Sequence, residues 1–466
     1  MSAPDAPPRY PDGFLWGVAT SAYQVEGGLN GPGEPANNWA VWEASGRVPR
    51  TGRGSAGWER WREDLDLAAA LEVNALRIGL EWARVEPEPG RFDAAAVAHY
   101  AAIVAGARER GMRVVLTLQH FTHPAWLGAD PWLDPAGPAR FARFAAEIAA
   151  RLGDALAERH GQRPVDLFVT VNEPNSLCLA TYVLGALPRG PGRGGFAAAG
   201  RALAGIFEGH VRAWRALHAL YAARGWPAPT VTYNAWACAA YGADRLFVDL
   251  LRPATRHRVP ELRRAFRRAL GPRGLKERLV DRLLGGLLGD DALRPLLATL
   301  SADEDPLDAL ALDFYGPFLG AYVGLRGLRV DPWTWPVPTD RLARFLAAWI
   351  GPHVDRPVYL LEHGLATRHP RGPDGRPRPD GVTRGALLRD AAAALDDAVS
   401  AGLPVAGYFH WSLVDNYEWG SWEPRFGLHG VDHEAPGAPR LATDMAGEDA
   451  AAVYRELIRA RRPRSA

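Results

Sequence analysis

The sequence predicts an α/β protein in which eight parallel strands close into a (β/α)8 barrel. Short apolar runs of β type alternate with longer stretches whose apolar residues fall at helical spacing, and this alternation favours parallel pairing. The strand-then-helix unit recurs until eight strands are present, a number that closes most naturally into a barrel. Because such barrels accept long insertions, we expect one domain over residues 10–460 of the 466.

The N-terminal half supplies the first four strands. Each is an apolar run bounded by turn-forming or polar residues, at 14–19, 75–80, 113–118 and 165–171. Trp58, Trp61 and Leu65 follow one another at spacings of three and four, which indicates an amphipathic helix before the second strand. The next helix, near 93–110, is expected to end at Gly111, because glycine is favoured just after a helix C-terminus.

The C-terminal half completes the barrel with apolar runs at 230–233, 307–312, 358–361 and 405–411. Helices are expected near 201–224, 340–351 and 383–401. The stretch 239–306 breaks this rhythm, since it is rich in Leu and Arg at helical spacing, and we expect it to be a helical insertion within the barrel. The segments rich in Gly, Pro and Arg, expected to be loops, are 184–195 and 368–381.

Composition argues against several classes of function. The 54 Lys and Arg residues against 53 Asp and Glu leave a net charge of +1, so no basic surface calls for nucleic acid or an anionic membrane. The N-terminus lacks the apolar segment of a secretion signal, and no later run is long and apolar enough to span a membrane. The two cysteines, Cys178 and Cys238, fit a reducing compartment. We therefore expect a cytoplasmic protein.

Two glutamates at predicted strand ends are the main candidates for catalysis. Glu173 closes the fourth strand just before Pro174, and Glu362 closes the seventh just before His363-Gly364. The C-terminal ends of barrel strands share one face, so both carboxylates can meet in one cavity. Such a pair suits cleavage of a glycosidic bond, where one oxygen needs a proton and an oxocarbenium-like carbon needs a negative partner. Each glutamate alone is better explained as structural; their common location favours catalysis.

Further polar side chains occupy other predicted strand ends. Arg77 or Tyr315 could donate a hydrogen bond to Glu362 and keep it ionised, as a nucleophile requires. Burial and a nearby second carboxylate would keep on Glu173 the proton that a general acid needs. Asn234 ends the fifth strand. The residues that could hold sugar hydroxyls are Gln24, His120, Asn172 and Glu418.

Other chemistries find little support in the sequence. His120 and His123 have no nearby cysteine or carboxylate, and Pro124 argues against a helix presenting both, so we expect no metal site. A Gly-x-Ser-x-Gly elbow is absent, as is a Gly-x-Gly-x-x-Gly turn after the first strand. We expect neither a serine hydrolase nor a dinucleotide-binding protein, and no cofactor.

Several motifs, in order along the chain, resemble glycoside hydrolase family 1. They are the run from Phe14 to Gly28, Asn172-Glu173-Pro174, Glu362-x-Gly364, and the run from Trp411 to Trp419 with Arg425 to Leu428. The resemblance implies a retaining β-glycosidase with Glu173 as acid/base and Glu362 as nucleophile. It implies supports or contacts near the nucleophile at Arg77, Asn234 and Tyr315. It also implies a sugar-binding wall made of Gln24, His120, Asn172, Trp411, Glu418 and Trp419.

The chain departs from the family pattern at several points. Phe121 follows His120 where the family usually has tryptophan, Asp313 stands where asparagine is usual, and His363 replaces the asparagine of Glu-Asn-Gly. The segment after Trp419 is slightly shorter than the common form, and 239–306 matches poorly. These departures concern the aglycone side and the sugar preference rather than the two-carboxylate chemistry.

The expected substrate is a small-molecule, unphosphorylated β-glucoside, with β-fucosides and β-galactosides tolerated. Family members that act on 6-phospho-sugars generally lack a carboxylate at the position of Glu418. A carboxylate there would repel the phosphate group of such a sugar. Two alternatives use the same site: transglycosylation to an alcohol or sugar, and a sugar-binding barrel without catalysis. The presence of both glutamates and the polar wall argues against the second. A retaining reaction requires carboxyl groups about 5 to 5.5 Å apart, and an inverting one about 6.5 to 9.5 Å.

Overall fold

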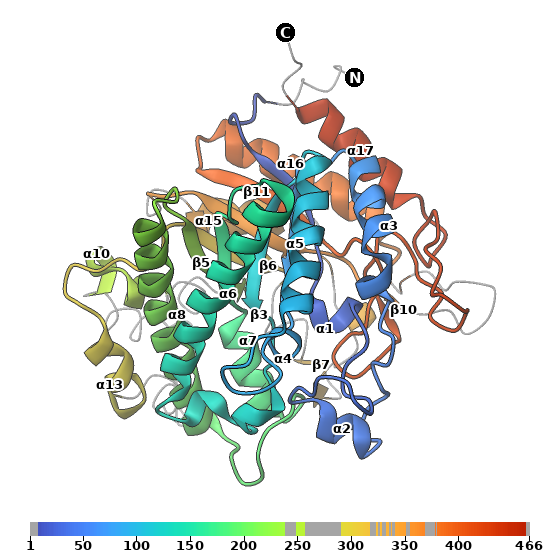
Figure 1. The fold of residues 1–466 in the computed structure, drawn as a ribbon. Coiled ribbons are helices and arrows are strands. Elements are labelled where there is room, and N and C mark those ends of the chain that lie inside the picture. Colours follow the sequence, from blue (N-terminus) through green and yellow to red (C-terminus); the bar gives the residue numbers. More distant parts are fainter. Residues whose placement is uncertain are drawn as a thin grey trace.

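Eight parallel strands form a closed barrel in the computed structural model of this chain (Figure 1). Around the barrel the order is β1, β11, β9, β6, β5, β4, β3 and β2, with β2 pairing back to β1. The strands are β1 (Leu15–Ala19), β2 (Ala75–Gly79), β3 (Arg113–Gln119), β4 (Leu167–Asn172), β5 (Thr230–Ala237), β6 (Leu310–Phe314), β9 (Val358–His363) and β11 (Val405–Trp411). The structure describes residues 8–237, 248–256, 290–316, 323–324, 327–328, 332–334, 337, 341–350, 355–368, 378 and 380–462.

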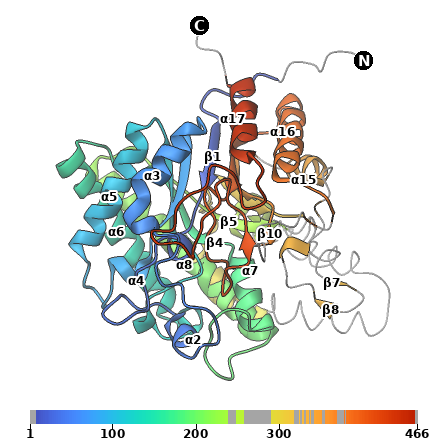
Figure 2. The same cartoon turned by 90° about the vertical axis from the view of Figure 1, so that its right-hand side faces the viewer.

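Long helices surround the barrel and connect its strands (Figure 2). They are α3 (Gly57–Ala70), α5 (Ala94–Glu109), α6 (Gly137–His160), α8 (Phe196–Arg224), α15 (Arg341–Ile350), α16 (Arg384–Ser400) and α17 (Ala450–Arg461). Side-chain caps fix where several begin: Asp93 accepts hydrogen bonds from the backbone of α5, Thr383 from α16 and Asp449 from α17. Figure 2 shows α17 at the end of the molecule opposite α2 (Ala40–Ala44).

Short elements follow the C-terminal ends of the strands, where sequence reasoning predicts the site. The short helices are α1 (Ala22–Val25), α4 (Trp82–Val85), α7 (Pro174–Cys178), η1 (Ala125–Leu127), η2 (Pro131–Leu133), η3 (Leu179–Leu184) and η4 (Pro332–Thr334). Two small antiparallel pairs join β7 (Val323–Gly324) to β8 (Gly327–Leu328), and β10 (Thr367–Arg368) to β12 (Pro424–Arg425).

The predicted fold class is confirmed, and strand bounds differ from the prediction by a few residues. β5 runs on to Ala237, past the predicted end at 233, and the terminal helix α17 was not predicted. Within the expected insertion 239–306, the described pieces are helical at α10 (Pro253–Arg256) and α13 (Asp290–Thr299). Residues 238–247 and 257–289 lie outside the described residues, so a helical insertion there stays a prediction.

Apolar side chains fill the barrel interior below the site. The inner cluster includes Leu15, Val115, Val169 and Phe409, all buried, and it is separate from the larger outer cluster between strands and helices. Gly17 in β1 leaves room for this packing, because a Cβ there would lie 2.3 Å from the Phe409 ring. A filled interior leaves the C-terminal mouth as the place for a ligand. Within the described part of the chain, no helix combines the length and apolar character needed to cross a membrane.

Candidate active site

Glu173 lies at the turn from β4 into α7. Its backbone is left-handed (φ 38°, ψ 61°), although the following Pro174 normally restricts the preceding residue to extended conformations. A left-handed conformation in a residue with a Cβ costs energy and persists where surrounding structure enforces it. The Glu173 amide donates to the Asn234 carbonyl at 2.9 Å, which ties this turn to β5. The strain therefore falls at the residue that sequence reasoning selects.

Glu362 lies near the end of β9 and accepts two hydrogen bonds. Arg77 Nη1 donates to its Oε1 at 2.5 Å, and the Tyr315 hydroxyl donates to its Oε2 at 2.9 Å. The Arg77 side chain is fully buried and also donates to Thr117 at 3.0 Å and to Asn172 at 2.5 Å. Burial raises the pKa of Glu362 above its usual value, and Arg77 and Tyr315 limit this rise. Glu362 is therefore ionised more readily than an equally buried carboxyl group that lacks these two hydrogen-bond donors.

Three carboxylates converge at the mouth of the barrel. One oxygen each of Glu173, Asp313 and Glu362 lies within 4.8 Å of the others. Burial, and next the charge of Glu362, raise the pKa of Glu173 to about 8. At neutral pH Glu173 therefore holds a proton beside the donor-stabilised Glu362. Oxygens this close are compatible with the separation of a retaining pair and closer than an inverting pair requires.

A second group of predicted residues lines the same mouth. Trp411 Nε1 donates to Glu418 Oε1 at 3.2 Å. Burial raises the pKa of Glu418 to about 8; the Trp411 hydrogen bond lowers this pKa, the charge of Glu362 raises it, and Gln24 lowers it by less. Gln24 is fully buried and donates to Asn416 at 3.0 Å. The charge of Glu362 thus acts on Glu418, which links this second group to the carboxylate cluster.

His120 stands in an aromatic layer. Its ring stacks on Trp411 and Trp419, with centroid distances of 5.8 and 5.7 Å and interplanar angles of 19° and 14°. Phe121, a departure from the family pattern, packs against Trp419 at 4.7 Å. Burial, and next the Arg77 charge, hold the pKa of His120 well below its usual value. A neutral His120 beside indole faces provides an apolar wall with a polar edge, which suits a sugar ring.

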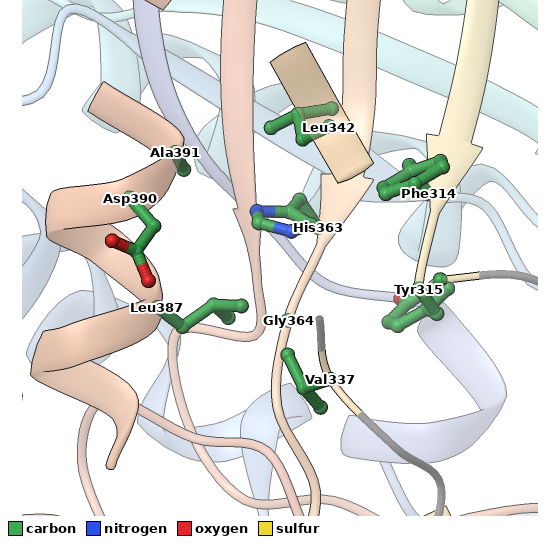
Figure 3. Close-up of a pocket in the computed structure, with 10 residues that line it drawn as sticks. Phe314, Tyr315, Val337, Leu342, His363, Gly364, Leu387, Asp390 and Ala391 are labelled. Atoms are coloured by element: carbon green, nitrogen blue, oxygen red, sulfur yellow. The ribbon is translucent and has the colours of Figure 1, made fainter. Parts of the chain in front are cut away.

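His363 faces away from the carboxylates. Figure 3 shows it among Phe314, Leu342 and Leu387, toward the layer formed by α15 and α16. Its Nδ1 shares a hydrogen bond of 2.9 Å with the Tyr408 hydroxyl. Successive residues of a strand point to opposite faces, which explains why Glu362 and His363 face different surroundings. The substitution at 363 therefore alters packing outside the barrel rather than a sugar contact.

The structure brings all the predicted site residues to one mouth and adds Asp313. Asn234 Nδ2 donates to Asn172 at 2.7 Å and also to Asp313, so it joins β4 to β6. Sequence reasoning noted Asp313 only as a departure and missed its place in the site. The signal was present: Asp313 is a carboxylate at the end of an apolar run, as Glu173 and Glu362 are.

The carboxylate cluster suits acid/base chemistry better than cation binding. Carboxylate oxygens attract hard cations. Here, however, the Arg77 guanidinium is bonded directly to Glu362 and fills the neighbouring position with a fixed positive charge. The arrangement offers a proton at Glu173 and a carboxylate at Glu362, the two groups that glycosidic cleavage needs.

A (β/α)8 barrel with paired buried carboxylates at the ends of β4 and β9 defines a glycoside hydrolase, and this is the class of the protein. The chain belongs to glycosyl hydrolase family 1, whose family model matches residues 6–243 and 329–462.

Curated relatives match over most of the chain. A bifunctional β-D-glucosidase/β-D-fucosidase of Bifidobacterium breve is 28% identical, with 91% of this chain and 94% of the relative covered. A β-galactosidase of Sulfolobus acidocaldarius is 25% identical, with 97% and 95% covered. Among solved structures, the β-glucosidase of Thermotoga maritima in complex with a substituted glucoimidazole aligns with a TM-score of 0.72 at 23% identity, covering 97% of this chain and 99% of that one. The structural likeness confirms the fold.

Proposed function

We propose that this protein is a retaining β-glucosidase that cleaves unphosphorylated β-glucosides by double displacement. Glu362 attacks the anomeric carbon while Glu173 protonates the leaving oxygen; Glu173 then deprotonates the water that releases the glycosyl-enzyme. The observation that carries this proposal is the close pair in unequal surroundings. For Glu173, burial and the charge of Glu362 outweigh the neighbours that lower its pKa, while Arg77 and Tyr315 stabilise the anion of Glu362.

The sugar preference follows from the wall and the relatives. Glu418, Gln24 and Trp411 supply hydrogen-bonding groups for a sugar, and family members that act on 6-phospho-sugars generally lack a carboxyl group at the position of Glu418. Relatives named β-glucosidase/β-fucosidase and β-galactosidase support tolerance of β-fucosides and β-galactosides. A panel of nitrophenyl β-glycosides compared by kcat/KM tests this order.

We also propose that residues 10–460 act as one catalytic domain and that the enzyme works in the cytoplasm. The closed barrel is built from strands spread between Leu15 and Trp411, which supports one folding unit. Cys178 is buried with a free thiol, as expected in a reducing compartment.

Variants of the two glutamates test the assignment of roles. With an activated aryl β-glucoside, Glu362→Ala should abolish turnover. Glu173→Ala should slow hydrolysis of the intermediate and cleavage of poor leaving groups by about 10² to 10⁴, while cleavage of the activated leaving group is spared. Glu147→Ala, which removes an exposed glutamate paired with Arg151 on α6, is the matched control and should retain activity. Equal, mild losses in both catalytic variants would overturn the assignment.

A further inference from the structure

Asp313 is a third carboxylate in the site, and the double displacement does not account for it. Its side chain is fully buried at the end of β6, and one of its oxygens lies within 4.8 Å of oxygens from Glu173 and Glu362. Asn234 Nδ2 donates to Asp313 Oδ2. Among the described residues, Oδ1 has no hydrogen-bond partner. Buried polar atoms are nearly always paired, so an orphaned oxygen amid carboxylates needs an explanation.

The charge balance around Asp313 explains why its Oδ1 has no hydrogen-bond partner. The groups that face it are Arg77 from β2, Glu173 after β4, Asn234 from β5, Tyr315 after β6 and Glu362 from β9. Within the described residues of this cluster, Arg77 carries the positive charge, and it bonds to Glu362. Three ionised carboxylates beside one guanidinium would leave two buried charges uncompensated, which is strongly unfavourable. Two of the three carboxyls therefore hold protons.

Glu362 is the carboxyl that ionises, because it alone of the three accepts from both Arg77 and Tyr315. The protons then belong to Glu173 and Asp313. Since Asp313 Oδ2 already accepts from Asn234, its proton belongs on Oδ1, the unpaired oxygen. A hydroxyl group there can donate a hydrogen bond to a neighbouring carboxyl oxygen, whereas two ionised carboxylates would repel each other.

We propose that Asp313 is held as a neutral carboxylic acid whose Oδ1–H donates to the carboxyl group of Glu173, making Asp313 a positioning residue for the acid/base. This inference rests on the proposed function. When Glu173 gives its proton to the leaving oxygen it becomes a carboxylate, and Glu362 becomes an uncharged ester. The site then still holds one anion beside Arg77, and Asp313 stabilises that anion by its hydrogen bond.

The pKa of Asp313 supports this geometry. Burial, and next the charge of Glu362, raise it well above its usual value. The Asp313 hydrogen bond in turn lowers the pKa of Glu173, which burial and Glu362 raise. A donor that favours the Glu173 anion assists the second step, in which Glu173 must act as a base.

Infrared difference spectroscopy at about pH 6, well above the unperturbed aspartate pKa, reads the proton directly. Subtracting the spectrum of Asp313→Asn from that of the unaltered enzyme should leave the carbonyl stretch of a protonated carboxylic acid. A difference made only of ionised carboxylate bands would overturn the proposal. Asp313→Ala gives the same readout should the asparagine variant misfold. Asp154→Asn, at an exposed carboxylate paired with Arg224, controls for general spectral changes.

The pH profile of kcat/KM gives a second readout. In Asp313→Asn no charge is lost and the amide retains a donor, so the alkaline pKa should move by less than about half a unit. If Asp313 were ionised, removing its charge would lower that pKa by about 1 to 3 units. Asp313→Ala should slow release of the intermediate about 10- to 100-fold, and asparagine should restore part of this loss. A loss of the same size in both variants would overturn the positioning role.

The two proposals fail separately. The infrared experiment needs no turnover, so absence of glycosidase activity would overturn the proposed function while the proton stays assigned to Asp313. An active enzyme without the protonated band would overturn the inference alone.

Discussion

At the residue scale, two chemically identical glutamates lie in different environments, and the proposed roles follow from this difference. Glu173 has a buried carboxyl beside another carboxylate, which favours its protonated form, with a pKa of about 8. Glu362 is equally buried but accepts from a guanidinium and a phenol, which favour its anion. The same Arg77 binds Asn172, the residue before Glu173, so one cation orients both parts of the site.

Tyr315 should tune the acid limb of the pH profile. Its hydroxyl stabilises the Glu362 anion, so Tyr315→Phe should raise the pKa of Glu362. More of Glu362 would then be protonated at low pH, and the acid limb of kcat/KM should move upward by about half to one unit.

Tyr408→Phe is the matched control, because that hydroxyl bonds to His363 outside the barrel. The acid limb of this control should stay in place. A shift of equal size in both variants, measured with one aryl β-glucoside, would contradict the role given to Tyr315.

At the element scale, irregular strand ends aim the side chains of the site. The register shifts between β4 and β5 before Asn172, between β6 and β9 before Asp313, and between β9 and β11 before His410. Such bulges re-aim side chains and are frequent beside active sites. After Glu362, Gly364 lets the chain pass Trp411, because a Cβ there would lie 2.1 Å from the Trp411 carbonyl oxygen. Where these shifts occur, the regular part of the strand supports the barrel and its irregular end supports the site.

The N-terminal cap of α5 offers a test of stability separate from catalysis. Asp93 accepts from the amides of Ala95 and Ala96 at 2.8 and 2.9 Å. Asp93→Ala should lower the free energy of unfolding by about 1 kcal/mol, measured by urea denaturation, with kcat/KM unchanged. Asp93→Asn keeps the acceptor and should retain most of the stability. An equal loss in both variants would show that the cap is not responsible.

At the scale of the whole molecule, the fold is readable from the sequence because its signal repeats. Eight apolar runs, each separated by turn-forming residues and helical spacing, predict the barrel even where single boundaries are wrong. β5 extends past its predicted end. The apolar run ends before the polar Asn234, but Asn234 and Trp236 still pair with β6. α17 was missed because nothing in the strand alternation requires a final helix, although Tyr454 on it donates to Gly17 of β1 at 2.8 Å.

The site was readable in part. Strand-end position marks Glu173 and Glu362, and the family motifs mark the rest of the wall, but neither gives orientation. His363 therefore looked like a change near the sugar, whereas it packs outside the barrel. Asp313 looked like a minor departure, whereas it completes a cluster of three carboxylates. Such differences arise from distances between strands far apart in sequence, which local patterns do not contain.

In the proposed mechanism, Glu362 and Glu173 carry out a double displacement. Proton NMR of the first sugar released from an aryl β-glucoside, recorded before mutarotation, tests it most directly. Two successive inversions at the anomeric carbon predict that the β-anomer appears first and the α-anomer follows only by mutarotation. Appearance of the α-anomer first would indicate a single inversion by water and would contradict the account.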